Sequence, residues 1–286
     1  MEGLNTFRYV VFTLCSTAAL SLAQTTKSTQ IVGGTSAAKG AWPWTTLVLI
    51  SRGGNSYLMC GGTLVSKNKV ITAAHCVTDT ATKEVFSTSL ATVRLGDVSM
   101  TGSDMVVHSV SSIVKHPYYD HATSWNDIAV LTLSDSSSQT TLRPADFSPA
   151  DGSNVTVVGW GNTAYQGSSS STLLQATVQV IPRATCISNY LSGNYASNNA
   201  YEICAGKLSG GVDACNGDSG GPLMYQLPDG SWRLVGIVSW GNGCAFANYP
   251  GWYTNVSRYR AFLESQGINF WKAAGAPSTA IPATIE

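Results

Sequence analysis

Short runs of apolar and β-branched residues recur along most of the chain, separated by clusters of glycine, serine and asparagine. This spacing is typical of an antiparallel β-barrel, in which each short strand is followed by a turn. The pattern predicts an all-β protein with two successive series of strands. The first series covers residues 46–50, 70–72, 92–95, 105–114 and 128–133. The second covers residues 155–158, 177–181, 221–225 and 234–239.

A helical period appears only near the C-terminus. Tyr259, Phe262 and Leu263 are spaced to share one face of a helix, and Ser257 is placed to cap its first turn. Residues 273–286 are rich in alanine, proline and threonine, which predicts a disordered tail. The serine-rich stretch 166–172 predicts an exposed loop.

The first 30 residues differ from the rest of the chain. Arg8 precedes a mostly apolar run over residues 9–22, and Ser21 and Ala23 are the small residues that a signal peptidase reads. Because the run is too short to span a membrane, we predict a signal peptide over residues 1–23 and secretion, rather than a buried N-terminal helix. Residues 24–30 are then a short polar propeptide.

Charged residues make up 11% of the chain, and the formal net charge is zero. This balance argues against a nucleic-acid partner, and we expect a monomer without a membrane partner. Of the seven cysteines, Cys15 lies in the predicted signal peptide and six remain. An even number in an exported protein suits disulfides. A zinc site is the alternative, but the chain has no C-x-x-C spacing.

The most informative motif is Cys215-Asn216-Gly217-Asp218-Ser219-Gly220-Gly221-Pro222. A serine between glycines has an exposed hydroxyl and nearby backbone N–H groups, as a nucleophile for acyl transfer requires. Four histidines could supply the base: His75, His108, His116 and His121. We favour His75, because it follows an apolar strand and precedes a cysteine that can hold it in place. Asp127 opens the apolar run 128–133 and is the best orienting acid.

These motifs, in this order and together with Ile31-Val32-Gly33-Gly34, resemble the trypsins of the chymotrypsin family of serine proteases. The resemblance covers residues 31–272. It implies two antiparallel six-stranded β-barrels and a C-terminal helix, with the site in the crevice between the barrels. It further implies that Ser219 attacks the scissile carbonyl, His75 transfers the proton and Asp127 orients His75. The backbone N–H groups of Gly217 and Ser219 would form the oxyanion hole.

The resemblance places Asp213 at the base of the primary specificity pocket. A buried carboxylate selects a cationic side chain, which implies cleavage after arginine or lysine. The other expected substrate-binding residues are Ala214, Asn216, Ser239, Trp240, Gly241 and Gly251. Ala214 stands where many trypsins have serine, so we expect arginine to be preferred over lysine. Trp252 replaces a small aliphatic residue, and we expect it to narrow or tilt the pocket.

The same resemblance implies that the protein is made as a zymogen. Cleavage before Ile31 would free an α-amino group that pairs with Asp218 and orders the site. Gln30 stands where a basic residue is usual, so we do not expect simple self-activation. Either another protease cuts there, or cleavage after Lys27 is followed by trimming.

Further expectations follow from the resemblance and from local motifs. The implied disulfides are Cys60–Cys76, Cys186–Cys204 and Cys215–Cys244. Asn154 and Asn255 begin N-glycosylation motifs. The segment 97–104 matches a calcium-binding loop of some relatives but is short and poor in carboxylates, so we expect no metal and no cofactor. Expected partners are protein or peptide substrates, proteinaceous protease inhibitors and an activating protease.

Two alternative interpretations remain at this stage. A non-catalytic binding protein on the same fold is disfavoured, because His75, Asp127 and Ser219 are all present. A protease of different specificity is disfavoured by Asp213, whereas Trp252 keeps that interpretation open.

Overall fold

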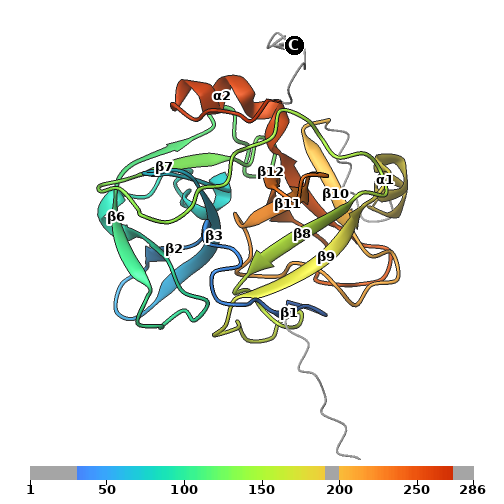
Figure 1. Ribbon diagram of the computed structural model, residues 1–286, viewed down its shortest axis with the longest axis horizontal. Helices are drawn as coiled ribbons and strands as arrows, with labels where there is room; N and C mark the ends of the chain where they lie inside the picture. The colour runs from blue at the N-terminus through green and yellow to red at the C-terminus, as the bar shows by residue number, and fades with distance from the viewer. Residues whose placement is uncertain (1–30, 191–199, 273–286) are drawn as a thin grey trace, which may run out of the picture.

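The computed structural model describes residues 31–190 and 200–272. The predicted signal peptide at 1–23, propeptide at 24–30 and tail at 273–286 lie outside the described residues. The described chain forms two closed antiparallel barrels that lie side by side (Figure 1). This architecture confirms the all-β prediction and the two six-stranded barrels with a C-terminal helix.

The first barrel has the strand order β2-β3-β4-β7-β6-β5. Its strands are β2 (Thr45–Ser51), β3 (Tyr57–Ser66), β4 (Lys69–Thr72), β5 (Ala91–Leu95), β6 (Val106–Lys115) and β7 (Ala129–Leu133). The second barrel has the order β9-β10-β13-β12-β11-β8, and β8 closes it by pairing with β9. Its strands are β8 (Asn154–Gly159), β9 (Leu174–Val180), β10 (Glu202–Gly206), β11 (Pro222–Gln226), β12 (Trp232–Trp240) and β13 (Gly251–Asn255). A short strand, β1 (Thr35–Ser36), pairs with β9 outside the barrel.

The sequence pattern missed three barrel strands, β3, β10 and β13. Glycines break the apolar run of β3 at Gly61 and Gly62, β10 ends with Gly206, and β13 begins with Gly251. These strands are specified by long-range pairing, because the glycines that weaken their local propensity allow close approach of neighbouring segments. A Cβ at Gly61, for example, would lie 2.8 Å from the Cα of Gly221.

The helices also differ from the prediction. An additional helix, α1 (Arg183–Tyr190), follows β9. The predicted C-terminal helix is present as α2 (Arg260–Ser265), which follows the 3₁₀ turn η4 (Val256–Tyr259). Ser257 lies inside that turn and donates its hydroxyl to the Asn255 Oδ1 atom, so the prediction that it caps the helix was wrong. Two further 3₁₀ turns are η1 (Ala74–Cys76) and η2 (Thr88–Leu90).

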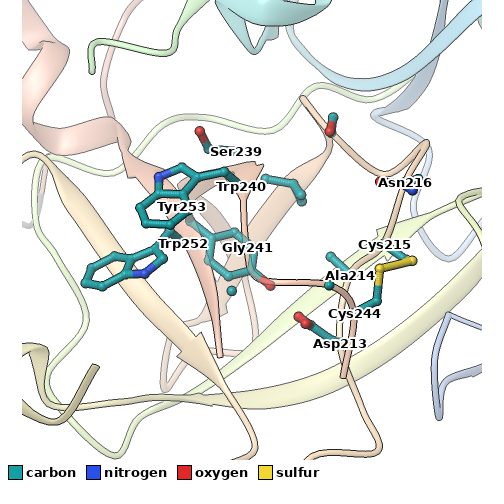
Figure 2. A pocket seen from close by; sticks show the side chains of 14 residues that line it. Asp213, Ala214, Cys215, Asn216, Ser239, Trp240, Gly241, Cys244, Trp252 and Tyr253 are labelled. Carbon is teal, nitrogen blue, oxygen red and sulfur yellow. A yellow bond between two sulfur atoms is a disulfide. The ribbon is translucent and has the colours of Figure 1, made fainter. Parts of the chain in front are cut away.

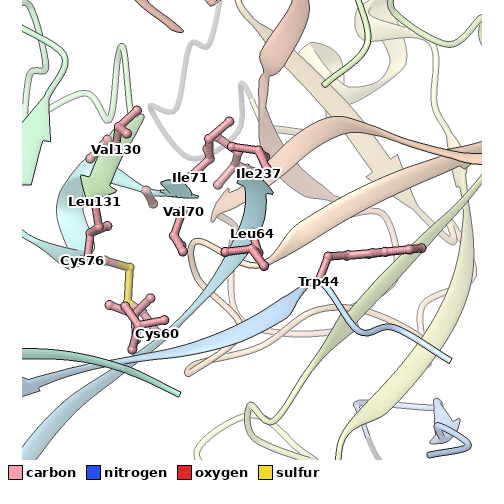
Figure 3. Packing of buried hydrophobic residues seen from close by; sticks show 14 of the residues in the cluster. Trp44, Cys60, Leu64, Val70, Ile71, Cys76, Val130, Leu131 and Ile237 are labelled. Atoms are coloured by element: carbon pink, nitrogen blue, oxygen red, sulfur yellow. A yellow bond between two sulfur atoms is a disulfide. The ribbon is translucent and has the colours of Figure 1, made fainter. Parts of the chain in front are cut away.

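The largest core cluster fills the first barrel and continues into the interface with the second (Figure 3). Leu64, Ile71 and Leu131 are fully buried in it, and each such side chain contributes roughly 1.5–3 kcal/mol of burial free energy. Ile237 from β12 belongs to the same cluster. The second barrel has a separate core cluster of its own, and because the first cluster bridges the two barrels, the loops that meet between them have a rigid base.

The described residues contain three disulfides, and they are the pairs implied by the resemblance. They are Cys60–Cys76, Cys186–Cys204 and Cys215–Cys244. The first closes a span of 16 residues, for which chain entropy predicts about 3 kcal/mol of stabilisation. Because Cys76 ends η1, this disulfide also holds the turn that carries His75.

Candidate active site

His75 and Asp127 come together from distant parts of the first barrel. His75 lies in η1, directly after β4, and Asp127 lies just before β7. The Asp127 carboxylate accepts two hydrogen bonds from His75, one from the backbone N–H (2.9 Å) and one from the ring Nδ1 (2.8 Å). The side chain of Asp127 is 1% exposed and that of His75 is 27% exposed. This geometry fixes the imidazole and turns its Nε2 atom away from the acid.

Two residues of the second barrel hold Asp127 in place. The Ser239 hydroxyl donates to Asp127 Oδ2 at 2.6 Å, and the Thr254 hydroxyl donates to the Asp127 carbonyl oxygen at 2.8 Å. Burial alone would raise the pKa of Asp127, but the charge of His75 and the hydrogen bonds from His75 and Ser239 to the carboxylate hold it below its usual value. Burial likewise acts to lower the pKa of His75, and the Asp127 carboxylate outweighs it, so the pKa of His75 is raised. The pair therefore favours an ionised acid beside an imidazole whose pKa is raised.

Ser219 lies against the same turn. Its carbonyl oxygen accepts from the Gly61 N–H at 2.7 Å and lies 3.5 Å from Cys76 Sγ. The His75 Nε2 atom is 3.7 Å from that same sulfur. Gly220 allows this close approach, because a Cβ there would lie 2.2 Å from the Thr72 hydroxyl oxygen. The structure thus brings the predicted nucleophile, base and acid into one neighbourhood.

The turn before Ser219 presents unoccupied backbone donors. Gly217 has φ +94°, a conformation that favours glycine, and a Cβ there would lie 2.6 Å from Met59 Cε. Within the described part of the chain, the N–H groups of Gly217 and Ser219 donate to no protein acceptor. Both groups are therefore available to stabilise an oxyanion.

A cavity of about 80 Å³ adjoins Ser219 (Figure 2). Asp213 is 5% exposed within it; its Oδ2 accepts from the Ala245 N–H at 3.0 Å, whereas its Oδ1 is buried without a hydrogen-bond partner. Burial raises the pKa of Asp213 to about 7. All of the expected substrate-binding residues line this cavity: Asp213, Ala214, Asn216, Ser239, Trp240, Gly241 and Gly251.

Sequence reasoning missed Tyr253. This residue lies on β13, is 1% exposed, and carries a buried hydroxyl without a partner. Figure 2 shows its hydroxyl directed toward the Asp213 side, and a Cβ at Gly251 would lie 3.3 Å from its Cε2 atom. Residues two apart on a strand face the same side, so the expected role of Gly251 in the cavity could have indicated that Tyr253 faces the cavity too. Ser239 lines the cavity, and its hydroxyl also donates to Asp127, a contact that sequence reasoning did not predict.

Two glycines and Trp252 shape the cavity. A Cβ at Gly251 would lie 3.2 Å from Asp213 Oδ1, and one at Gly241 would make ordinary contacts with the Gly243 carbonyl oxygen at 3.7 Å and the Gly251 Cα at 3.8 Å. The Trp252 indole is 1% exposed and stacks on Trp240 with ring centroids 5.7 Å apart. Figure 2 shows it beside Trp240, pointing away from Asp213. Trp252 therefore does not narrow the end of the cavity where Asp213 lies.

Asp218 lies in a buried cradle next to the nucleophile. Its carboxylate accepts from the N–H groups of Gly161 (2.7 Å) and Cys215 (2.9 Å), and Cβ atoms at Gly159 or Gly161 would collide with it. Burial raises the pKa of Asp218 to about 6. No cationic side chain of residues 31–190 or 200–272 forms an ion pair with it. Ile31 is fully buried in the same barrel, in a cluster with Ala214.

The other three histidines have separate partners. His108 bonds to Asp135, His121 bonds to Tyr119, and His116 packs on Tyr259 and Phe262. Cys60, His75 and Cys76 have the spacing of metal ligands, but the two sulfurs are bonded to each other and offer no thiolate. This group therefore lacks the donors that a zinc ion would need.

The two glycosylation motifs differ in exposure. Asn154 is exposed at the start of β8. Asn255 is 3% exposed, and its amide donates to Ser148 at 2.7 Å. A glycan on Asn255 would require this part of β13 to open, so the fold argues against that expected modification.

The described residues include no helix of sufficient length and hydropathy to cross a membrane.

Comparison with known proteins matches the family model described as Trypsin to residues 31–263. The chain is 38% identical over 246 residues to the proclotting enzyme of Tachypleus tridentatus. The matched region covers 82% of this chain and 65% of that relative. It is 36% identical over 250 residues to the suppressor of tumorigenicity 14 protein homolog of Bos taurus (84% of this chain, 28% of the relative). It is also 36% identical over 243 residues to transmembrane protease serine 11C of Mus musculus (83% and 53%).

The chain spans less than two thirds of the length of each of these relatives. The family model nevertheless matches most of this chain, and the two-barrel fold and its three disulfides agree with the match. The chain belongs to the trypsin family of serine proteases.

Proposed function

We propose that this protein is a serine endopeptidase that cleaves peptide bonds after arginine and, less readily, after lysine. The observation that carries this proposal is the unpartnered Oδ1 atom of Asp213 in a cavity that Ser219 also lines. A buried carboxylate oxygen without a partner is costly, and a guanidinium that enters the cavity removes that cost. The similarity to a proclotting enzyme and to a transmembrane serine protease supports the hydrolytic activity.

Catalysis would begin when the Ser219 hydroxyl attacks the scissile carbonyl carbon. The Nε2 atom of His75 accepts the hydroxyl proton, and a tetrahedral intermediate forms. His75 then donates the proton to the leaving amine, which yields an acyl-enzyme on Ser219. Water then attacks the acyl-enzyme carbonyl while His75 accepts a proton from it. His75 returns that proton to Ser219 as the acid product leaves. Asp127 supports both steps, because its ionised carboxylate stabilises the imidazolium and keeps Nδ1 protonated.

The carbonyl oxygen would become negatively charged in each intermediate. The N–H groups of Gly217 and Ser219 are the donors that we assign to it, since neither donates to a protein acceptor within the described residues. Each donor of this kind typically contributes about 3 kcal/mol to transition-state stabilisation. The φ of Gly217, +94°, is one that glycine adopts readily, so the turn that carries this N–H has no need of a side chain at that position.

The preference for arginine would follow from Ala214 at the cavity wall. A lysine ammonium is a compact ion with three donors, and alanine offers it no hydroxyl acceptor. The arginine side chain is longer than that of lysine, and its planar guanidinium carries five N–H donors. An arginine can therefore reach Asp213 and also donate to the Tyr253 hydroxyl.

Activation would depend on Asp218. Its buried carboxylate has a raised pKa and lacks a cationic side-chain partner within the described residues, so a freed α-amino group at Ile31 would neutralise it. Cleavage before Ile31 by another protease, or trimming after Lys27, would generate that group. Because Val32 already bridges to Asp213, with the Asp213 N–H donating to the Val32 carbonyl at 3.1 Å, cleavage at this point would couple directly to the specificity cavity.

The remaining features of the proposal concern the whole chain. Residues 1–23 would direct secretion, 24–30 would be the propeptide and 31–272 the protease domain. Three disulfides are consistent with an oxidising compartment. We retain Asn154 as the glycosylation site. The partners would be protein substrates, proteinaceous inhibitors and an activating protease, with a monomeric enzyme.

The test uses peptide amides that differ only in the residue before the scissile bond: arginine, lysine, leucine or aspartate. The full chain is expressed, its active form is isolated, and Ser219→Ala serves as the inactive control. We expect kcat/KM to be highest for arginine, lower for lysine and undetectable for the other two. Preference for leucine or aspartate would contradict the proposal. N-terminal sequencing of the active form should begin at Ile31; a start upstream would contradict the activation mechanism.

A further inference from the structure

A second cavity, of about 410 Å³, lies outside the site described above. No residue that lines it also lines the cavity of Asp213. Its floor is formed by β8 and β9, which pair with each other and lie side by side in Figure 1. Gly33, just before β1, and Val212, just before Asp213, belong to its wall. Cavities of about 300–1,000 Å³ are typical of small-molecule sites, so this one has room for a small organic ligand.

Two indoles form an apolar corner of this cavity. Trp42 and Trp232 are each partly buried, and their rings meet edge to face at 78° with centroids 4.9 Å apart. Gln175 on β9 orients the first ring, because Trp42 Nε1 donates to the Gln175 Oε1 atom at 2.7 Å. Two rings nearly at a right angle offer a flat apolar group both a face and an edge. Since the corner is held in place before a ligand arrives, binding there carries no cost of ordering the rings.

The polar groups on the floor have hydrogen-bonding capacity to spare. Thr156 is 7% exposed, and its hydroxyl forms no hydrogen bond within the described residues. Thr177 lies opposite Thr156 in the register of β8 and β9, so both side chains lie on the outer face that lines the cavity. Because Gln175 Oε1 accepts from Trp42, the Gln175 Nε2 atom remains as a donor. A ligand that brings acceptor atoms would pair with these groups.

Lys207 gives the cavity its charge. Gly206, the last residue of β10, pairs with Gln179 of β9, so Lys207 leaves the sheet close to Thr177. Its exposed ammonium forms no ion pair with any acid of residues 31–190 or 200–272. The described lining includes no aspartate or glutamate. One positive charge surrounded by N–H and O–H donors is complementary to a single carboxylate.

We propose that this cavity binds a small organic acid in which a flat apolar body carries one carboxylate. The apolar body would lie in the corner of Trp42 and Trp232. The carboxylate would pair with Lys207 and accept from the hydroxyls of Thr156 and Thr177. This binding activity goes beyond peptide hydrolysis, and it uses none of the residues assigned to catalysis.

The experiment measures binding to the purified full chain by isothermal titration calorimetry. The probe is cinnamate, a planar acid, and cinnamamide is its neutral isostere. The variants are Lys207→Met, Lys207→Arg and Thr156→Val, the last of which keeps the shape of the side chain. Lys67→Met, at an exposed lysine between β3 and β4, is the matched control. Because the titration requires no hydrolysis, its outcome is independent of the proposed function.

Cinnamate should bind at one site per chain, and cinnamamide about tenfold more weakly, because the amide lacks the charge that pairs with Lys207. Lys207→Met should weaken cinnamate about fivefold, the upper range for an exposed ion pair, and leave cinnamamide unchanged. Lys207→Arg and Lys67→Met should stay within about twofold of wild type. Thr156→Val should weaken cinnamate about fivefold through loss of one donor, with no loss of thermal stability.

Three results would overturn the proposal. The first is the absence of saturable binding of cinnamate up to about 5 mM, a range in which a ligand of this size should bind a site that fits it. The second is equal affinity for cinnamate and cinnamamide, or equal losses in Lys207→Met and Lys67→Met, because either would mean binding without Lys207. The third is displacement of cinnamate by an aryl amidine, which would place the acid in the Asp213 cavity.

Discussion

Replacing Asp213 by asparagine tests how the cavity selects its substrate. The two side chains have the same shape, so the asparagine oxygen can still accept from the Ala245 N–H while the charge is lost. The neighbouring Tyr253 and Gly251 should keep their positions. The change therefore isolates the electrostatic contribution of Asp213 from its packing.

The structure gives the magnitude. Burial raises the pKa of Asp213 from 3.8 to about 7. At about 1.4 kcal/mol for each tenfold change in proton affinity, the ionised carboxylate is about 4 kcal/mol less stable in the empty cavity than in water. A guanidinium about 4 Å away recovers a similar energy at an effective dielectric constant of about 20. Loss of this pairing should lower kcat/KM for arginine substrates by about 10³-fold.

The assay measures kcat/KM for two peptide amides, one with arginine and one with citrulline, its neutral isostere, before the scissile bond. Wild type should prefer arginine by about 10³-fold, and Asp213→Asn should reduce that ratio to less than about tenfold. Asp229→Asn, at an exposed hairpin position, is the control for loss of an acidic side chain. An Asp213→Asn enzyme that cleaves the arginine substrate within tenfold of wild type would refute the reasoning.

Three further predictions address the support of the site. Ser239→Ala removes the hydroxyl that donates to Asp127 at 2.6 Å, so kcat should fall about tenfold; an unchanged kcat and pH–rate profile would contradict the role of this contact. Gly161→Ala would place a Cβ 2.5 Å from the Asp218 carboxylate, and we expect about 3 kcal/mol of destabilisation in urea unfolding together with loss of activity; a fully active, stable variant would exclude the cradle. The raised pKa of Asp213 means that protons compete with a bound cation, so the Kd of an aryl amidine should rise about tenfold for each pH unit below about 7 and level off above it. This titration is measured calorimetrically with the catalytic histidine replaced by alanine, and a Kd constant from acid to neutral pH would contradict it.

The sequence predicted the parts of the fold that have a local signal. Alternation and turn residues located nine of the barrel strands, because these strands carry β-branched residues on a half-buried surface. The strands β3, β10 and β13 were missed, since their glycines are explained only by the neighbouring segment that approaches them. A Cβ at Gly206 on β10, for instance, would lie 2.7 Å from Pro250.

The resemblance supplied the residues of the candidate site, but not how they support one another. Ser239 was expected to contact substrate, and only the pairing of the two barrels shows that its hydroxyl reaches Asp127 across 112 positions of sequence. Tyr253 carries no local motif. The direction of the Trp252 ring follows from the register of β12 and β13, which no local pattern specifies.

The central claim is that the alcohol of Ser219 is the nucleophile, activated by His75 in a folded, processed enzyme. The most direct measurement is intact-protein and peptide mass spectrometry after treatment with a fluorophosphonate. The account predicts a single adduct on Ser219 that appears in step with loss of activity, and no adduct when His75 is replaced by alanine. Complete inactivation with Ser219 unmodified, or full activity with Ser219 modified, would contradict it.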